Sequence, residues 1–131
     1  METTTNAQAP VAGPVRVWLR LEGLFVVVIS LAIYVKAGGT WGRFFALILV
    51  PDLSLLGYLA GPYAGAWTYN TVHSALGPLL LGAACATGLL PMTLLPYAAI
   101  WAAHVGMDRA FGYGLKYPTA FRHTHLSRIG A

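Results

Sequence analysis

Four long apolar stretches, separated by short turns rich in glycine and proline, dominate the pattern of hydrophobic and polar positions along the chain. They cover residues 17–35, about 44–60, about 67–90 and about 97–112. A membrane-spanning helix needs roughly 17–25 residues, which the fourth stretch reaches if it begins near Met92. The pattern therefore predicts an all-α protein, an antiparallel bundle of four transmembrane helices.

Composition supports a protein whose main partner is the lipid bilayer. Of the 131 residues, 57% are hydrophobic and 9% are charged, whereas soluble domains carry about a quarter charged residues. The length allows one transmembrane domain, residues 16–115. Residues 1–15 are small and polar and are expected to form a disordered tail. Residues 116–131 are basic and aromatic, as expected of a cytoplasmic C-terminal tail at the lipid interface.

The basic residues flank the apolar stretches instead of forming a patch, so the net charge of +4 does not point to nucleic acid. Basic residues gather on the cytoplasmic side of a membrane protein. Four spans place both termini on one side, and that side would hold six basic residues against Lys36 and Arg43 on the other. We therefore expect both termini in the cytoplasm. The six are Arg16, Arg20, Arg109, Lys116, Arg122 and Arg128.

Ionisable residues inside the apolar stretches indicate a site. An ionised group at the bilayer centre costs roughly 2.5–3.5 kcal/mol unless it is paired or functional. At about 1.5 Å of rise per residue, all of them lie within about 12 Å of the cytoplasmic ends of their helices. The four helices thus bring polar groups to one level in the cytoplasmic half of the bilayer. These residues are Glu22, Asp52, His73, His104 and Asp108.

Spacing within the stretches agrees with this convergence. His104 and Asp108 are four residues apart, and Asn70 and His73 are three apart, so each pair shares one helical face. Pro51 removes one helical hydrogen bond and leaves a carbonyl free, so a kink is expected there. The small-residue run at residues 82–88 would allow close helix approach, which makes self-association plausible.

Carboxylates and imidazoles together suit a divalent transition metal, Zn²⁺, Fe or Mn, held between the helices of a bundle. Glu22, Asp52, His73, His104 and Asp108 would suffice for one metal or a carboxylate-bridged pair. Metal-activated water could then hydrolyse a small or lipid-linked substrate, which would make the chain an enzyme. Four further residues would orient ligands, hold an anionic substrate or close the site from below: Asn70, Arg20, Arg109 and His125.

Two other functions fit the same residues. The polar groups could relay protons or ions, or they could form a purely structural network. The structural alternative pairs Glu22 with Arg109 and Asp108 with Arg20, and lets Asp52 accept a bond from a histidine. The single cysteine excludes internal disulfides and any cysteine-built metal site.

Several segments carry a resemblance to a known family. They are LRLEG (residues 19–23), PDLSLLGYLAGP (51–62), YNTVH (69–73), AHVGMDRAFGYGLKYPTAF (103–121) and THL (124–126). On these segments the chain resembles a family of small bacterial integral-membrane proteins known as domain of unknown function 4260, over nearly everything after residue 15. The resemblance implies a multi-pass protein, here of the bacterial cytoplasmic (inner) membrane, without an established activity. A looser similarity, in residue types only, exists to membrane-bound metal-dependent hydrolases.

Overall fold

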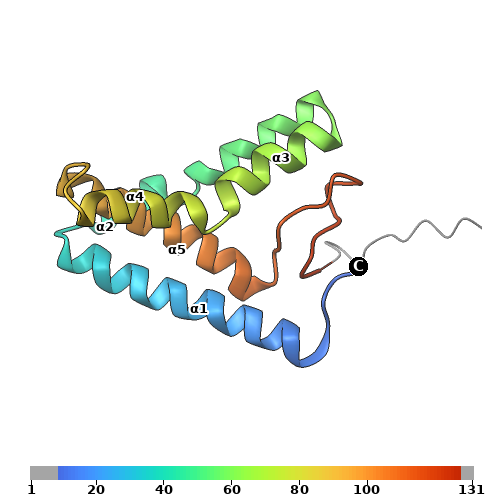
Figure 1. Cartoon of the computed structure of the whole chain (residues 1–131), viewed down its shortest axis with the longest axis horizontal. Helices are drawn as coiled ribbons and strands as arrows, with labels where there is room; N and C mark the ends of the chain where they lie inside the picture. The colour runs from blue at the N-terminus through green and yellow to red at the C-terminus, as the bar shows by residue number, and fades with distance from the viewer. Residues whose placement is uncertain (1–8, 128–131) are drawn as a thin grey trace, which may run out of the picture.

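The computed structural model describes residues 9–127, and within them the fold is all-helical (Figure 1). The only β pairing of these residues is an isolated bridge between Lys116 and Thr124. In chain order the elements are the α-helices and 3₁₀ helices α1 (Gly13–Lys36), α2 (Trp41–Leu47), η1 (Val50–Ala60), α3 (Pro62–His73), α4 (Leu76–Ala86), η2 (Met92–Leu94) and α5 (Leu95–Phe111).

The first and last apolar stretches form continuous helices, as expected. Pro14 lies in the first turn of α1, where its missing N–H leaves no helical bond unmade. Gly112 ends α5 with a φ of 90°, the left-handed conformation that glycine adopts most readily. Residues 1–8 of the predicted tail lie outside the described residues. Val11, in the remainder of that predicted tail, donates its N–H to the carbonyl of His125, so this part of the tail is attached to the C-terminal segment.

The second stretch changes helix type part of the way along. α2 ends at Leu47, and η1 follows as a 3₁₀ helix of 11 residues, although such helices rarely exceed four. Pro51 has no N–H, and the N–H of Asp52 bonds to the carbonyl of Leu49. The carbonyl of Ile48 therefore has no partner within its own helix. Where a kink was expected at this proline, the structure has a change from α- to 3₁₀-helix.

The third stretch was expected to form one helix over residues 67–90, and this prediction is wrong. α3 ends at His73, Ser74 is extended with a ψ of 154°, and α4 begins at Leu76. Pro78 follows in the first turn of α4 and has no N–H to offer to the preceding turn. The interruption leaves the carbonyls of Val72 and His73 without helical partners, and side chains of another helix bind them.

The central element is α5. α1 packs along one side of α5 and α4 packs on another, while η1 and α3 form an antiparallel hairpin (Figure 1). A Cβ added to Gly23 would lie 2.8 Å from the carbonyl oxygen of Gly106, so α1 and α5 approach closely only because both residues are glycine. The C-terminal segment, residues 113–127 and hereafter the C-terminal loop, runs between α3 and α1 (Figure 1).

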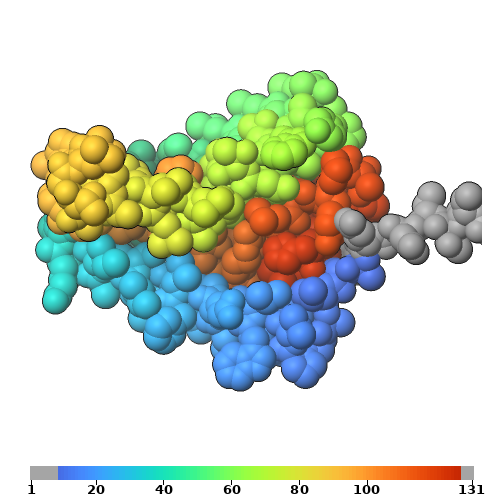
Figure 2. All heavy atoms as spheres, viewed as in Figure 1, coloured from blue at the N-terminus to red at the C-terminus, as the bar shows by residue number. Residues whose placement is uncertain are grey.

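Much apolar surface of the described chain is uncovered. Two helical stretches, Gly13–Lys36 and Trp41–Ala60, are long and apolar enough to cross a membrane. Only 17% of each span is buried inside the protein. Figure 2 shows α1 along one edge of the molecule with its outer face open, and there Phe25 is 68% exposed. Monomeric soluble proteins rarely expose contiguous apolar surface on this scale, so membrane association is indicated.

Candidate metal centre

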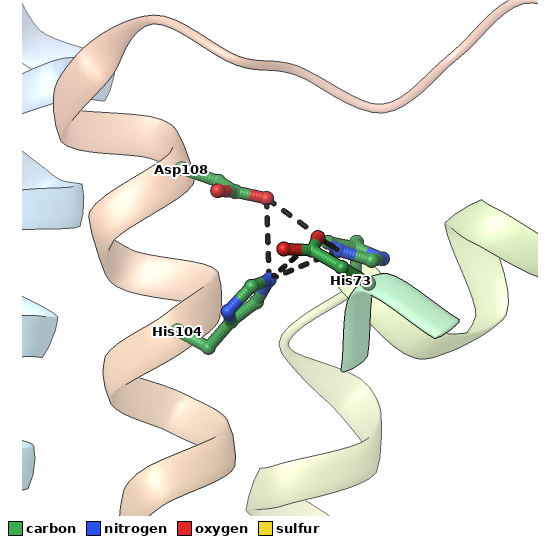
Figure 3. A group of neighbouring side chains, drawn as sticks. His73, His104 and Asp108 are labelled. Carbon is green, nitrogen blue, oxygen red and sulfur yellow. Dashed lines mark hydrogen bonds and ion pairs between the residues drawn. The ribbon is translucent and has the colours of Figure 1, made fainter. Parts of the chain in front are cut away.

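Four side chains from three helices meet beside the middle of α5. Asp52 comes from the first turn of η1, His73 is the last residue of α3, and His104 and Asp108 lie one turn apart on α5. One ligand atom of each residue lies within 4.8 Å of the others. In Figure 3 the imidazoles of His73 and His104 and the carboxylate of Asp108 point toward one another.

The Nε2 atoms of the two histidines are the atoms that the other members of the cluster surround. Nε2 of His73 lies 3.1 Å from Nε2 of His104. Oδ1 of Asp52 lies 3.2 Å and 3.3 Å from these two nitrogens, and Oδ2 of Asp108 lies 3.6 Å and 3.7 Å from them. The histidine side chains are 0% and 2% exposed, Asp108 is 15% exposed and Asp52 is 40% exposed. The cluster is therefore closed except at Asp52.

Backbone carbonyls determine which nitrogen of each imidazole carries the proton. Nδ1 of His104 lies 2.6 Å from the carbonyl oxygen of Ile48, and Nδ1 of His73 lies 3.0 Å from that of Tyr69. A carbonyl oxygen can only accept a hydrogen bond, so each Nδ1 is the donor. In a neutral imidazole the other nitrogen, Nε2, then carries a lone pair. Both lone pairs are directed into the cluster.

Four acceptor atoms therefore face one another. Two unprotonated Nε2 atoms cannot bond to each other, and the two carboxylates beside them would give the group a charge of −2 when both are ionised. A tetrahedral ion with bonds of about 2.0–2.1 Å places its ligand atoms about 3.3–3.4 Å apart. Five of the six separations, 3.1–3.7 Å, lie on both sides of this value, and the two carboxylate oxygens lie within 4.8 Å of each other. The cluster could thus hold a metal ion.

The interrupted helices take part in building the site. The carbonyl of Ile48, freed at Pro51, accepts the Nδ1–H of His104. At the second interruption, the carbonyl of Val72 accepts from Nε1 of Trp101 at 2.7 Å, and that of His73 accepts from Nη2 of Arg109 at 2.9 Å. Buried carbonyls without partners are costly, so α5 stabilises both interruptions while it supplies two of the four cluster residues.

Tyr69 belongs to the site although the sequence reasoning missed it. Its hydroxyl donates to Oδ2 of Asp108 at 3.2 Å, and its ring stacks on the imidazole of His73 with 3.8 Å between the centroids. The signal available in the sequence was its position four residues before His73, which places both side chains on one helical face.

Glu22 is not part of the cluster, contrary to the expected convergence of five residues. Its side chain is exposed on α1, beside the buried Gly23 that faces α5. The ion pairs of the structural alternative are not among those formed within residues 9–127. Nε of Arg20 donates to the carbonyl of Ala110, and Arg109 donates to backbone carbonyls of His73 and Tyr113.

Asn70 and His125 hold the C-terminal loop and do not orient a histidine of the cluster. The amide of Asn70 donates to the carbonyl of Lys116 at 2.8 Å and accepts from its N–H at 2.7 Å. His125 does fold back, as expected, but its Nδ1 accepts from the N–H of Leu115. Burial, assisted by the charge of Arg109, lowers the pKa of His125. Arg128, also expected near the interface, lies outside the described residues.

A groove of about 930 Å³ runs beside the site, between α3, α4 and the C-terminal loop. Asn70, Lys116 and His125 contribute to its wall together with Trp67 and Trp101. None of the four cluster residues lines this groove. A smaller apolar groove of about 290 Å³, lined by Pro51, lies between η1, α4 and α5.

Comparison with known proteins gives a family but no activity. The family described as Domain of unknown function (DUF4260) matches residues 16–129, which is most of the chain. No curated protein and no solved structure matches. The chain therefore belongs to the DUF4260 family, whose function is unknown.

Proposed function

We propose that this protein binds one divalent transition metal ion inside the membrane, through Asp52, His73, His104 and Asp108. The observation that carries the proposal is the pair of Nε2 atoms 3.1 Å apart beside two carboxylates, on imidazoles whose Nδ1 atoms are each held by a backbone carbonyl. Two nitrogen and two oxygen ligands near tetrahedral spacing favour Zn²⁺, with Fe and Mn as the other candidates. A divalent ion would also balance the two carboxylate charges.

The proposal includes four spans in the bacterial cytoplasmic membrane, formed by α1, by α2 with η1, by α3 with α4, and by α5. Irregular backbone at membrane depth is tolerated where it is buried in protein and its polar groups have partners. The side chains of α5 that bind the freed carbonyls at Ile48, Val72 and His73 supply those partners. The excess of basic residues on one side supports termini in the cytoplasm.

The open edge at Asp52 supports a hydrolytic role for the metal. Asp52 is 40% exposed while both histidines are buried, so this is the side from which a water molecule or substrate oxygen would approach the proposed ion. A bound divalent ion lowers the pKa of water and polarises a phosphate or ester oxygen. Hydrolysis of a small or lipid-linked substrate is therefore the reaction that we propose.

Ion or proton conduction is the second candidate, and the interrupted helices favour it. Many transporters place their ion sites where two discontinuous helices meet in the membrane. Here the interruptions near Pro51 and Ser74 both adjoin the cluster. The purely structural alternative has its expected contact of Asp52 with a histidine, Nε2 of His73 at 3.2 Å, but its arginine–carboxylate pairs are not among those formed by the described residues.

Metal content tests the proposal directly. Protein purified in detergent without exposure to chelator should contain one transition metal per chain by elemental analysis. His104→Ala should reduce the content to a small fraction, because it removes one of two nitrogen ligands. His123→Ala is the matched control, since His123 contacts Thr119 in the C-terminal loop and should keep the metal. Absence of stoichiometric metal from the unsubstituted protein would contradict the proposal.

A second experiment separates hydrolysis from conduction. Hydrolysis predicts release of p-nitrophenol from phosphate or carboxylic esters in proportion to metal occupancy, with loss of activity in Asp52→Asn. Conduction predicts proton or cation flux in proteoliposomes that carry no bound metal, again abolished by Asp52→Asn. Flux without esterase activity would replace the hydrolytic proposal by the conducting one.

A further inference from the structure

Tyr69 touches two members of the cluster at once. Its hydroxyl donates to Oδ2 of Asp108, and its ring stacks on His73 with an angle of 10° between the planes. It also provides the backbone carbonyl that fixes the tautomer of His73. Rotation of one imidazole and of one carboxylate is therefore limited by this single residue.

The ring of Tyr69 is itself held by the C-terminal loop. The ammonium group of Lys116 lies 4.8 Å from the centroid of this ring and 3.4 Å from that of Phe121, so it can make a cation–π contact with both rings. Lys116 is 4% exposed, and its Nζ donates to the carbonyl of Phe121 at 2.9 Å. Asn70 binds its N–H and its carbonyl, so both ends of this lysine are fixed.

We propose that Tyr69 is a positioning residue of the metal centre, and that Lys116 holds Tyr69 in place. The inference rests on the proposed metal-binding function and adds to it a role for the C-terminal loop. Within this arrangement the loop is part of the support for the ligands, although none of its residues belongs to the cluster.

Asp108 gains most from this support. Its Oδ2 lies 3.6 Å and 3.7 Å from the histidine nitrogens, farther than the corresponding oxygen of Asp52. Without the hydroxyl of Tyr69, the carboxylate would have to lose rotational freedom each time the metal binds. Loss of an outer contact to a ligand typically lowers metal affinity about 10–100-fold.

Co²⁺ is a suitable probe because its visible absorption reports the geometry of its ligands. Tyr69→Phe keeps the stacked ring and removes only the hydroxyl, so Co²⁺ affinity should fall about 10–100-fold and the absorption band should change. Tyr63→Phe is the matched control on the same helix, because Tyr63 is 66% exposed and its aromatic contact is with Trp67. It should leave affinity and spectrum unchanged.

Lys116→Met tests the second half of the inference with Tyr69 left in place. It should lower Co²⁺ affinity severalfold and alter the spectrum in the same sense, whereas Lys36→Met on exposed surface should do neither. This variant keeps the inference testable if Tyr69→Phe does not fold.

The possible outcomes separate the two proposals. Unsubstituted protein that binds no Co²⁺ or Zn²⁺ removes the metal-binding function and this inference together. Binding by the unsubstituted protein, with the same affinity and spectrum in Tyr69→Phe or in Lys116→Met, removes the inference alone. Tighter binding in Tyr69→Phe would also overturn it.

Discussion

Each histidine of the cluster is oriented by a main-chain carbonyl. His104 is bound by Ile48 and His73 by Tyr69, so substitution of those partners leaves the accepting oxygen in place. In the proposed metal site both imidazoles would offer Nε2 to the ion, and Asp52 and Asp108 would supply the negative charge. Removal of one carboxylate should therefore lower the affinity for divalent ions, because less negative charge remains, without rotating either imidazole ring.

The buried ammonium group of Lys116 should make the free energy of unfolding depend on pH. Burial lowers its pKa from 10.5 to about 8. The folded protein therefore holds this proton less tightly than the unfolded chain. The contribution of this group to the free energy of unfolding should be constant below pH 8 and should rise between pH 8 and 10.5.

Thermal unfolding in detergent across this range measures the effect. The melting temperature of the unsubstituted protein, relative to that of Lys116→Met, should increase from pH 8 to pH 10. A difference that stays flat or decreases would contradict the assigned direction of the pKa.

At the scale of elements, the contact between α1 and α5 depends on two glycines. A Cβ on Gly23 would meet the carbonyl oxygen of Gly106 and the N–H of Ala110 at 2.8 Å, and a Cβ on Gly106 would lie 2.7 Å from the carbonyl oxygen of Gly23. These obstacles are backbone atoms, and the Cβ of Arg109 is nearer still to a Cβ on Gly23, so the helices would have to separate. Both helices would then lose their closest packing.

Gly23→Ala should consequently lower stability by about 1–3 kcal/mol, the usual cost of overpacking. Gly82→Ala is the control, because nothing lies within 4 Å of a Cβ added at Gly82 in α4. Alanine is favoured over glycine inside a helix by about 0.5–1 kcal/mol, so the control should be neutral or stabilising. Equal melting temperatures for the two variants would show that the close approach is unimportant.

The helices were largely predictable from the apolar stretches, and the interruption at Ser74 was not. Local signals do exist at Pro51, where a kink was expected and a change of helix type is found. At Ser74 the extended residue is stabilised by Trp101 and Arg109, which lie far along the chain. Tertiary contacts of this kind leave no periodic pattern in the sequence.

In the site, the depth of each side chain along its helix was predictable, but the direction in which it points was not. Counting residues along each helix gives the depth of a side chain, and the four side chains of the cluster do lie together. Depth does not give rotation about the helix axis, which is why Glu22 was misplaced. Gly23 faces α5, whereas Glu22, about 100° farther round the helix, is exposed. The assignment of the four as metal ligands stays a prediction.

At the scale of the whole molecule, the exposed apolar surface requires apolar surroundings. The described core contains few large side chains, among them Tyr34 and Phe44, while many large apolar side chains are exposed along α1 and η1. A bilayer would cover this area, and the charge distribution would orient the chain within it.

Cysteine labelling tests that orientation in a Cys85→Ala background, which removes the one native thiol, buried in α4. Lys36→Cys should react with a membrane-impermeant maleimide added to intact cells with a permeabilised outer membrane, and Arg122→Cys should react only after lysis. Both positions are exposed, so access depends on the side of the membrane. The reverse labelling pattern would mean that the termini lie outside.

The three hydrogen bonds from α5 to the interrupted helices also have a consequence for biosynthesis. In the proposed four-span arrangement, the carbonyls of Ile48, Val72 and His73 would enter the bilayer during translation before their partners on α5 have been made. Until then these groups must stay near water or the insertion machinery, because lipid offers them no donor. The two middle segments thus reach their final shape only once the last helix has arrived, and nascent chains stalled before it should be recognised by quality-control proteases.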